Sequence, residues 1–110
     1  MKRWLVLAAL VALGCSGSTV MNHDQLESEI RQLHSLDEEM ALVEEVFVTR
    51  HVPRRIARKH AAYLFQSARE HGEKLAKAQP GPGDESALTR ARADAVRLEQ
   101  RSVALMVQMR

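Results

Sequence analysis

Apolar side chains recur every three or four positions through the acidic segment from His23 to Thr49. They are Leu26, Ile30, Leu33, Leu36, Met40, Val43 and Phe47, at spacings of 4, 3, 3, 4, 3 and 4 residues. This period places one apolar stripe along an α-helix. Asn22 or Asp24 can accept a hydrogen bond from a free backbone N–H group of the first turn. The pattern predicts a helix over residues 23–49.

A second stripe begins at a proline. Pro53 fixes its own φ and disfavours helical angles at Val52, so this pair marks a break, with Pro53 in the first turn of the next helix. One kinked helix that continues through Pro53 is the alternative. Small or apolar positions then recur at alternating spacings of 4 and 3, which predicts a helix over residues 53–78: Ala57, Ala61, Leu64, Ala68, His71, Leu75 and Ala78.

The third stripe follows a turn. Residues 79–86 (QPGPGDES) combine proline and glycine as turns do. The helix that follows is predicted over about residues 86–108, and either Asp84 or Ser86 can mark its start. Its seam is Leu88, Ala91, Ala95, Leu98, Ser102, Leu105 and Met109. Helices of similar length with short connections pack antiparallel at shallow angles. We therefore expect an all-α domain over residues 23–110, either a three-helix antiparallel bundle or a coiled-coil hairpin.

The N-terminal residues follow a different pattern. Lys2 and Arg3 precede an unbroken apolar run of ten residues, Trp4 to Leu13. A cationic start, an apolar core of about 7–15 residues and a small residue at the cut are typical of a secretory signal peptide. A membrane span is the alternative, but it needs about 20 predominantly apolar residues. We predict that residues 1–14 are a signal peptide that is cleaved.

The residues at the predicted cut carry a resemblance. Residues 12–15 (ALGC) resemble the lipobox of bacterial lipoproteins, with alanine where leucine is most usual, and the resemblance ends at about Ser18. It implies a bacterial source, cleavage between Gly14 and Cys15, and a Cys15 that carries diacylglycerol and an N-acyl chain. Ser16 resembles the family's pattern for sorting to the outer membrane. Residues 15–22 are then a lipidated N-terminus and short tether.

Physical chemistry accords with this resemblance. Cys15 is the one cysteine of the chain, and an odd cysteine in an exported protein is free, paired between molecules or modified. One acyl chain binds a membrane only marginally, whereas two or more anchor it stably. An ordinary cleaved signal with an incidental cysteine and an uncleaved anchor are the alternatives.

Charge is segregated along the chain. The net charge is +2, and it falls to zero for side chains 15–110 once Lys2 and Arg3 are removed. Residues 24–49 hold eight acidic residues and one basic residue, a net charge of −7, whereas residues 50–78 hold eight basic and two acidic residues, a net charge of +6. The densest cluster of cations is Arg50, Arg54, Arg55, Arg58 and Lys59.

This cluster predicts contact with an acidic partner. The alternative is that it neutralises acidic residues of the first helix, namely Glu38, Glu39, Glu44 and Glu45. Nucleic acid is excluded as a partner, because no aromatic residues for base stacking are interleaved with the arginines and an exported protein rarely meets it. We expect an acidic envelope protein or peptidoglycan, and the pattern leaves a homo-oligomer open.

Candidate chemistry is sparse. The sequence has no H-E-x-x-H motif, glycine-rich phosphate loop or G-x-S-x-G motif. Counting residues back from the turns places His34, His71 and Asp94 at one level of the bundle, where they form a conceivable metal-binding or pH-sensing cluster. The alternative is a seam histidine beside surface charges, with no cofactor.

The sequence therefore predicts a lipid-anchored, non-enzymatic envelope protein on the periplasmic face of the outer membrane. It is expected to act as a scaffold, adaptor or assembly factor through its helical bundle. A periplasmic metal or stress sensor that uses His34, His71 and Asp94 is one alternative, and a pilotin-like lipoprotein of a secretion system is another.

Overall fold

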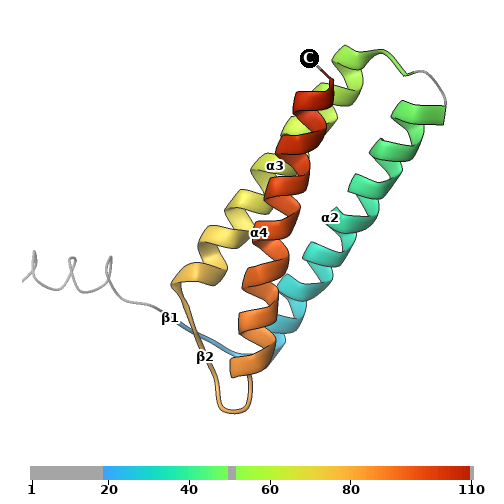
Figure 1. The fold of residues 1–110 in the computed structure, drawn as a ribbon. Helices are drawn as coiled ribbons and strands as arrows, with labels where there is room; N and C mark the ends of the chain where they lie inside the picture. Colours follow the sequence, from blue (N-terminus) through green and yellow to red (C-terminus); the bar gives the residue numbers. More distant parts are fainter. Residues whose placement is uncertain (1–18, 50–51, 110) are drawn as a thin grey trace, which may run out of the picture.

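Three long helices form the body of the protein (Figure 1). The structure is a computed structural model that describes residues 19–49 and 52–109. Helix α2 spans His23–Thr49, α3 spans Arg54–Lys77 and α4 spans Glu85–Gln108. They run up, down and up, and every pair of helices packs together. The predicted three-helix fold is confirmed.

The ends of the helices follow local chemistry. The Asn22 side chain accepts a hydrogen bond from the backbone N–H of Gln25 at 2.8 Å, and the Gln25 side chain accepts one from the backbone N–H of Asn22 at 3.0 Å. This reciprocal pair is a capping box, so Asn22 rather than Asp24 caps α2. Pro53 precedes α3 in extended conformation. Helices α2 and α3 are separate and pack side by side, so the alternative of one kinked helix is wrong.

The core lies where the three seams meet. Every predicted seam residue of the third stripe is buried, and in the second stripe His71 is the only one outside the buried core. Small residues bring α3 and α4 close: a Cβ atom added to Gly72 of α3 would lie 3.6 Å from that of Ala95 on α4. Ser102 is fully buried, and its hydroxyl donates a hydrogen bond to the carbonyl of Leu98 at 2.8 Å.

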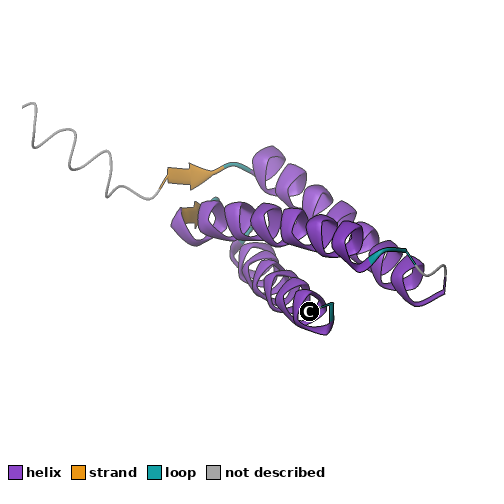
Figure 2. Ribbon diagram, turned by 90° about the horizontal axis from the view of Figure 1, so that it is seen from above, coloured by secondary structure: helices purple, strands orange, loops and turns teal. Residues whose placement is uncertain are grey.

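A small sheet, which the helical pattern did not predict, closes one end of the bundle. Strand β1, Thr19–Met21, pairs in parallel with β2, Ala78–Pro80, and Figure 2 shows both strands at one end of the helices. Residues 19–21, predicted as part of a free tether, are thus attached to the segment that follows α3. The turn to α4 contains Gly83 at φ +81°, a conformation that glycine adopts without strain.

No helix within residues 19–49 and 52–109 is long and apolar enough to cross a membrane.

Candidate functional site

The predicted lipidation site precedes the described part of the chain. Gly14, Cys15 and the signal peptide over residues 1–14 lie outside the described residues, as does Arg50 of the basic cluster. Thr19, where β1 begins, is four residues after Cys15, and four residues of extended chain span at most about 14 Å. In the sequence, Cys15 thus comes shortly before the strand that closes one end of the bundle.

The cations of the predicted cluster that the structure describes lie at the opposite end, in the first two turns of α3. Arg54, Arg55, Arg58 and Lys59 are exposed, and they line a shallow hollow of about 430 Å³ together with Met109, which follows α4. We call these four cations the basic tip. The first turn of α3 has no acidic residue and Pro53 offers no capping side chain. Cations at the start of a helix interact unfavourably with its dipole, and each exposed cation lowers the stability of the helix by about 0.3–1 kcal/mol.

Three acidic residues of α2 have partners outside the basic tip, namely Asp37, Glu39 and Glu44. Arg101 of α4 donates hydrogen bonds to Glu44 at 2.6 Å and to Asp37 at 2.8 Å, and the hydrogen bond to Glu44 raises the pKa of Arg101. Glu39 lies 3.9 Å from His60. Among residues 19–49 and 52–109, Arg55, Arg58 and Lys59 form no ion pair. These three cations therefore do not pair directly with acidic residues of α2 in the described part of the chain.

A buried carboxylate joins α2 to α3. Glu29 has a side chain only 3% exposed, and it accepts hydrogen bonds from His71 Nδ1 at 2.6 Å and from Lys74 Nζ at 2.8 Å. Burial alone would raise the pKa of Glu29, but the hydrogen bonds from Lys74 and His71 outweigh it and hold this pKa below its ordinary value. Because a carboxylate only accepts hydrogen bonds, Nδ1 of His71 carries the proton.

The hydrophobic pattern does not identify Glu29, because charged residues are rarely buried unless they are paired. The spacing of the apolar stripe of α2 does, however, indicate that position 29 faces the core. With Ile30 the first spacings are 4, 3 and 3, whereas with Glu29 they become 3, 4 and 3 and match the rest of the helix. The regular position belongs to Glu29, and Ile30 is only partly buried beside it.

The predicted cluster of His34, His71 and Asp94 is not formed. His71 lies at the level of Glu29, which is five residues from His34 on α2, or about 7.5 Å along the axis. Counting from the turns misplaced α3 against α2 by about one helical turn. Within the described ranges, no group of three His, Cys, Asp or Glu side chains is arranged to hold a metal ion.

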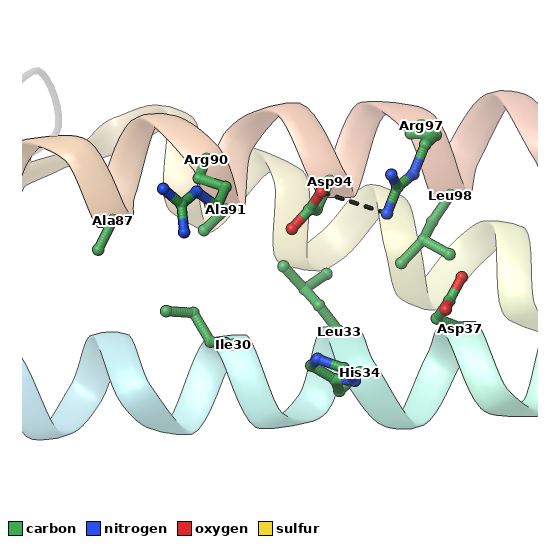
Figure 3. A pocket seen from close by; sticks show the side chains of 10 residues that line it. All are labelled: Ile30, Leu33, His34, Asp37, Ala87, Arg90, Ala91, Asp94, Arg97 and Leu98. Carbon is green, nitrogen blue, oxygen red and sulfur yellow. Dashed lines mark ion pairs between the residues drawn. The ribbon is translucent and has the colours of Figure 1, made fainter.

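His34 and Asp94 line the same groove of about 260 Å³ between α2 and α4 (Figure 3). Asp94 is engaged within its own helix, where Arg97 lies 3.2 Å from its carboxylate. The groove has an apolar floor and a rim of mixed charge, with these polar residues: His34, Asp37, Arg90, Asp94 and Arg97. His71 is not among its lining residues.

No family model matches the chain, and it has no significant match among curated proteins or solved structures.

Proposed function

We propose that the chain is a lipid-anchored, non-enzymatic protein of the bacterial cell envelope, held by acyl chains on Cys15 at the periplasmic face of the outer membrane. Its role is that of a scaffold, adaptor or assembly factor. The signal-like residues 1–14 and the lipobox-like residues 12–15 support the anchor. The long helices support the role, because they separate the two ends of the molecule.

One observation carries the proposal: strand β1, which follows Cys15 in the sequence, and the basic tip lie at opposite ends of the bundle. Strand β1 is paired at one end, and the exposed Arg55, Arg58 and Lys59 begin α3 at the other. Helix α3 has 24 residues, so the ends are about 36 Å apart at 1.5 Å per residue. The Debye length is about 8 Å at physiological ionic strength. If the bundle stands upright, the attraction between the basic tip and the lipid headgroups of the anchoring membrane is therefore screened.

The basic tip is therefore available to an acidic surface on another envelope component. We place an acidic envelope protein first, because Arg55, Arg58 and Lys59 are exposed and form no ion pair within the described residues. Exposed cations of this kind attract a complementary surface and raise the rate of association. Peptidoglycan is the other anionic component within reach.

Charge reversal at the tip tests this role. The double variant R55E/R58E of the full chain, which leaves Lys59 unchanged, is compared with R31E/R90E, which makes the same change of charge at exposed positions away from the tip. After cross-linking in cells, the tip variant is expected to lose its cross-linked protein species while the control retains them. Binding to purified cell-wall sacculi is measured in parallel, and its selective loss would identify peptidoglycan instead. Equal behaviour of the two variants in both assays would refute the role of the tip.

A further inference from the structure

An apolar groove lies between the last turns of α2 and the first turns of α3. It has a volume of about 250 Å³, and its walls are mainly Leu42, Val46 and Phe47 on one side and Val52 and Ile56 on the other. Leu42 and Ile56 remain 58% and 54% exposed. Large apolar side chains gathered at an exposed groove are typical of a contact surface. This groove is separate from the hollow of the basic tip, which lies towards α4.

The two edges of the apolar groove carry opposite charge. Glu38 and Glu45 lie one turn before and after Leu42 on α2, and Lys59 and His60 lie one turn after Ile56 on α3. In the described part of the chain, Glu38, Glu45 and Lys59 are exposed and form no ion pair. The surface therefore has an acidic edge on α2 and a basic edge on α3.

We propose that a second copy of this chain covers the apolar groove, related to the first by a two-fold axis parallel to the helices. Such a rotation places the acidic edge of each copy against the basic edge of the other, so the surface is complementary to itself. A two-fold axis that crosses the helices within the interface places α2 on α2 and α3 on α3. That arrangement brings like charges together and is disfavoured.

The same axis fixes which residues meet. Rotation about this axis does not change the position of a residue along the length of the bundle. The contact between Glu39 and His60 shows which residues of α2 and α3 lie at the same position along that length. Lys59 of one copy therefore lies near Glu38 of the second copy, and Leu42 near Ile56. The two copies also point the same way, with both β1 strands at one end. This orientation allows both chains to be anchored in one membrane, although the pairing does not depend on the anchor.

Sedimentation of the full chain in detergent micelles tests the pairing, at chain concentrations up to about 100 µM. The chain is expected to form a dimer. L42E is expected to weaken self-association about tenfold or more, because it places a charge at the centre of the contact. V96E changes a valine that is 52% exposed on α4 and is expected to leave the dimer intact.

A pair of charge variants tests the orientation. In K59E alone or E38K alone, both contacts between the copies become repulsive, and self-association is expected to weaken. When the two variants are mixed with different tags, both contacts become attractive again, and a heterodimer is expected. A monomeric full chain, equal effects of L42E and V96E, or a mixture that does not pair would each overturn the proposal. Because the chain is studied in micelles, these results do not depend on whether Cys15 is lipidated or the basic tip binds a partner.

Discussion

Glu29 and His71 are 42 positions apart in the sequence, yet Oε2 of Glu29 accepts a hydrogen bond of 2.6 Å from Nδ1 of His71. The contact sets the register of α2 against α3. Lys74, one turn further along α3, reaches the other oxygen of the same carboxylate. The buried carboxylate is thus fully hydrogen-bonded, while its partners remain partly open to water, with side chains 21% and 64% exposed.

Replacing Glu29 separates the contribution of its charge from that of its volume. E29A is expected to lower the free energy of unfolding by about 1–2 kcal/mol, since it removes two hydrogen bonds whose donors water can still reach. E29L loses the same two hydrogen bonds but fills the space with apolar volume, so it is expected to lose less stability than E29A. Denaturant midpoints measure both. If E29L lost as much stability as E29A, the carboxylate would contribute more than this account allows.

Acid unfolding provides a second test of the same group. The pKa of Glu29 is lowered in the folded state, so the unfolded chain binds its proton more readily. The stabilisation is present above the ordinary value of 4.5 and is lost as the pH falls through the lower folded value. Unfolding midpoints measured from pH 6 downward should fall less steeply in E29L than in the natural chain. Parallel curves would contradict the assignment.

At the sheet end of the bundle, His23 predicts a pH dependence of the opposite sign. Its Nδ1 lies 3.0 Å from a carboxylate oxygen of the buried Asp84, and this hydrogen bond, followed by the charges of Asp84 and Glu27, raises the pKa of His23 above 6.5. The added stability is present below pH 6.5 and is lost as the pH rises through the folded value. The thermal midpoint should therefore fall between pH 6 and pH 8.

In the variant H23Q, the thermal midpoint should fall less between pH 6 and pH 8 than in the natural chain. H34Q, which changes another exposed histidine of α2, is the control, and its midpoint should fall as in the natural chain. A slope that H34Q removes and H23Q keeps would refute the role of His23.

Arg92 of α4 caps the C-terminal end of α3. Its guanidinium donates hydrogen bonds to the backbone carbonyls of Leu75 at 2.9 Å and of Ala78 at 2.5 Å. R92M is expected to lower the free energy of unfolding by about 1.5–3 kcal/mol, as expected for lost hydrogen bonds to a charged group. It should also speed amide hydrogen exchange at the end of α3. R90M, at an exposed position two residues away, should change neither quantity, and equal effects of the two variants would contradict this capping role.

The helices could be predicted from the sequence because each seam repeats at one period. Pro53 and the glycines after Pro80 then divide the chain at the right places. The pairing of β1 with β2 could not be predicted, since a strand of three residues is too short to show an alternating pattern. The register between α2 and α3 could not be predicted either, because it depends on a buried glutamate that a hydrophobic pattern passes over.

The basic tip shows a similar limit. Its cations are visible in the sequence, but their pairing is not. Arg101 of α4 pairs with Asp37 and Glu44 of α2, whereas Arg55, Arg58 and Lys59 form no ion pair among the described residues. The segregation of charge along the sequence therefore does not predict which residues form ion pairs in the folded chain.

The mass of the intact chain, extracted from the membranes of a bacterium that produces it, tests the central claim most directly. We predict a polypeptide that begins at Cys15 and exceeds the mass of residues 15–110 by one diacylglycerol and one further acyl group, with both additions on the first residue after fragmentation. An unmodified Cys15, or a chain that retains Met1, would contradict the account.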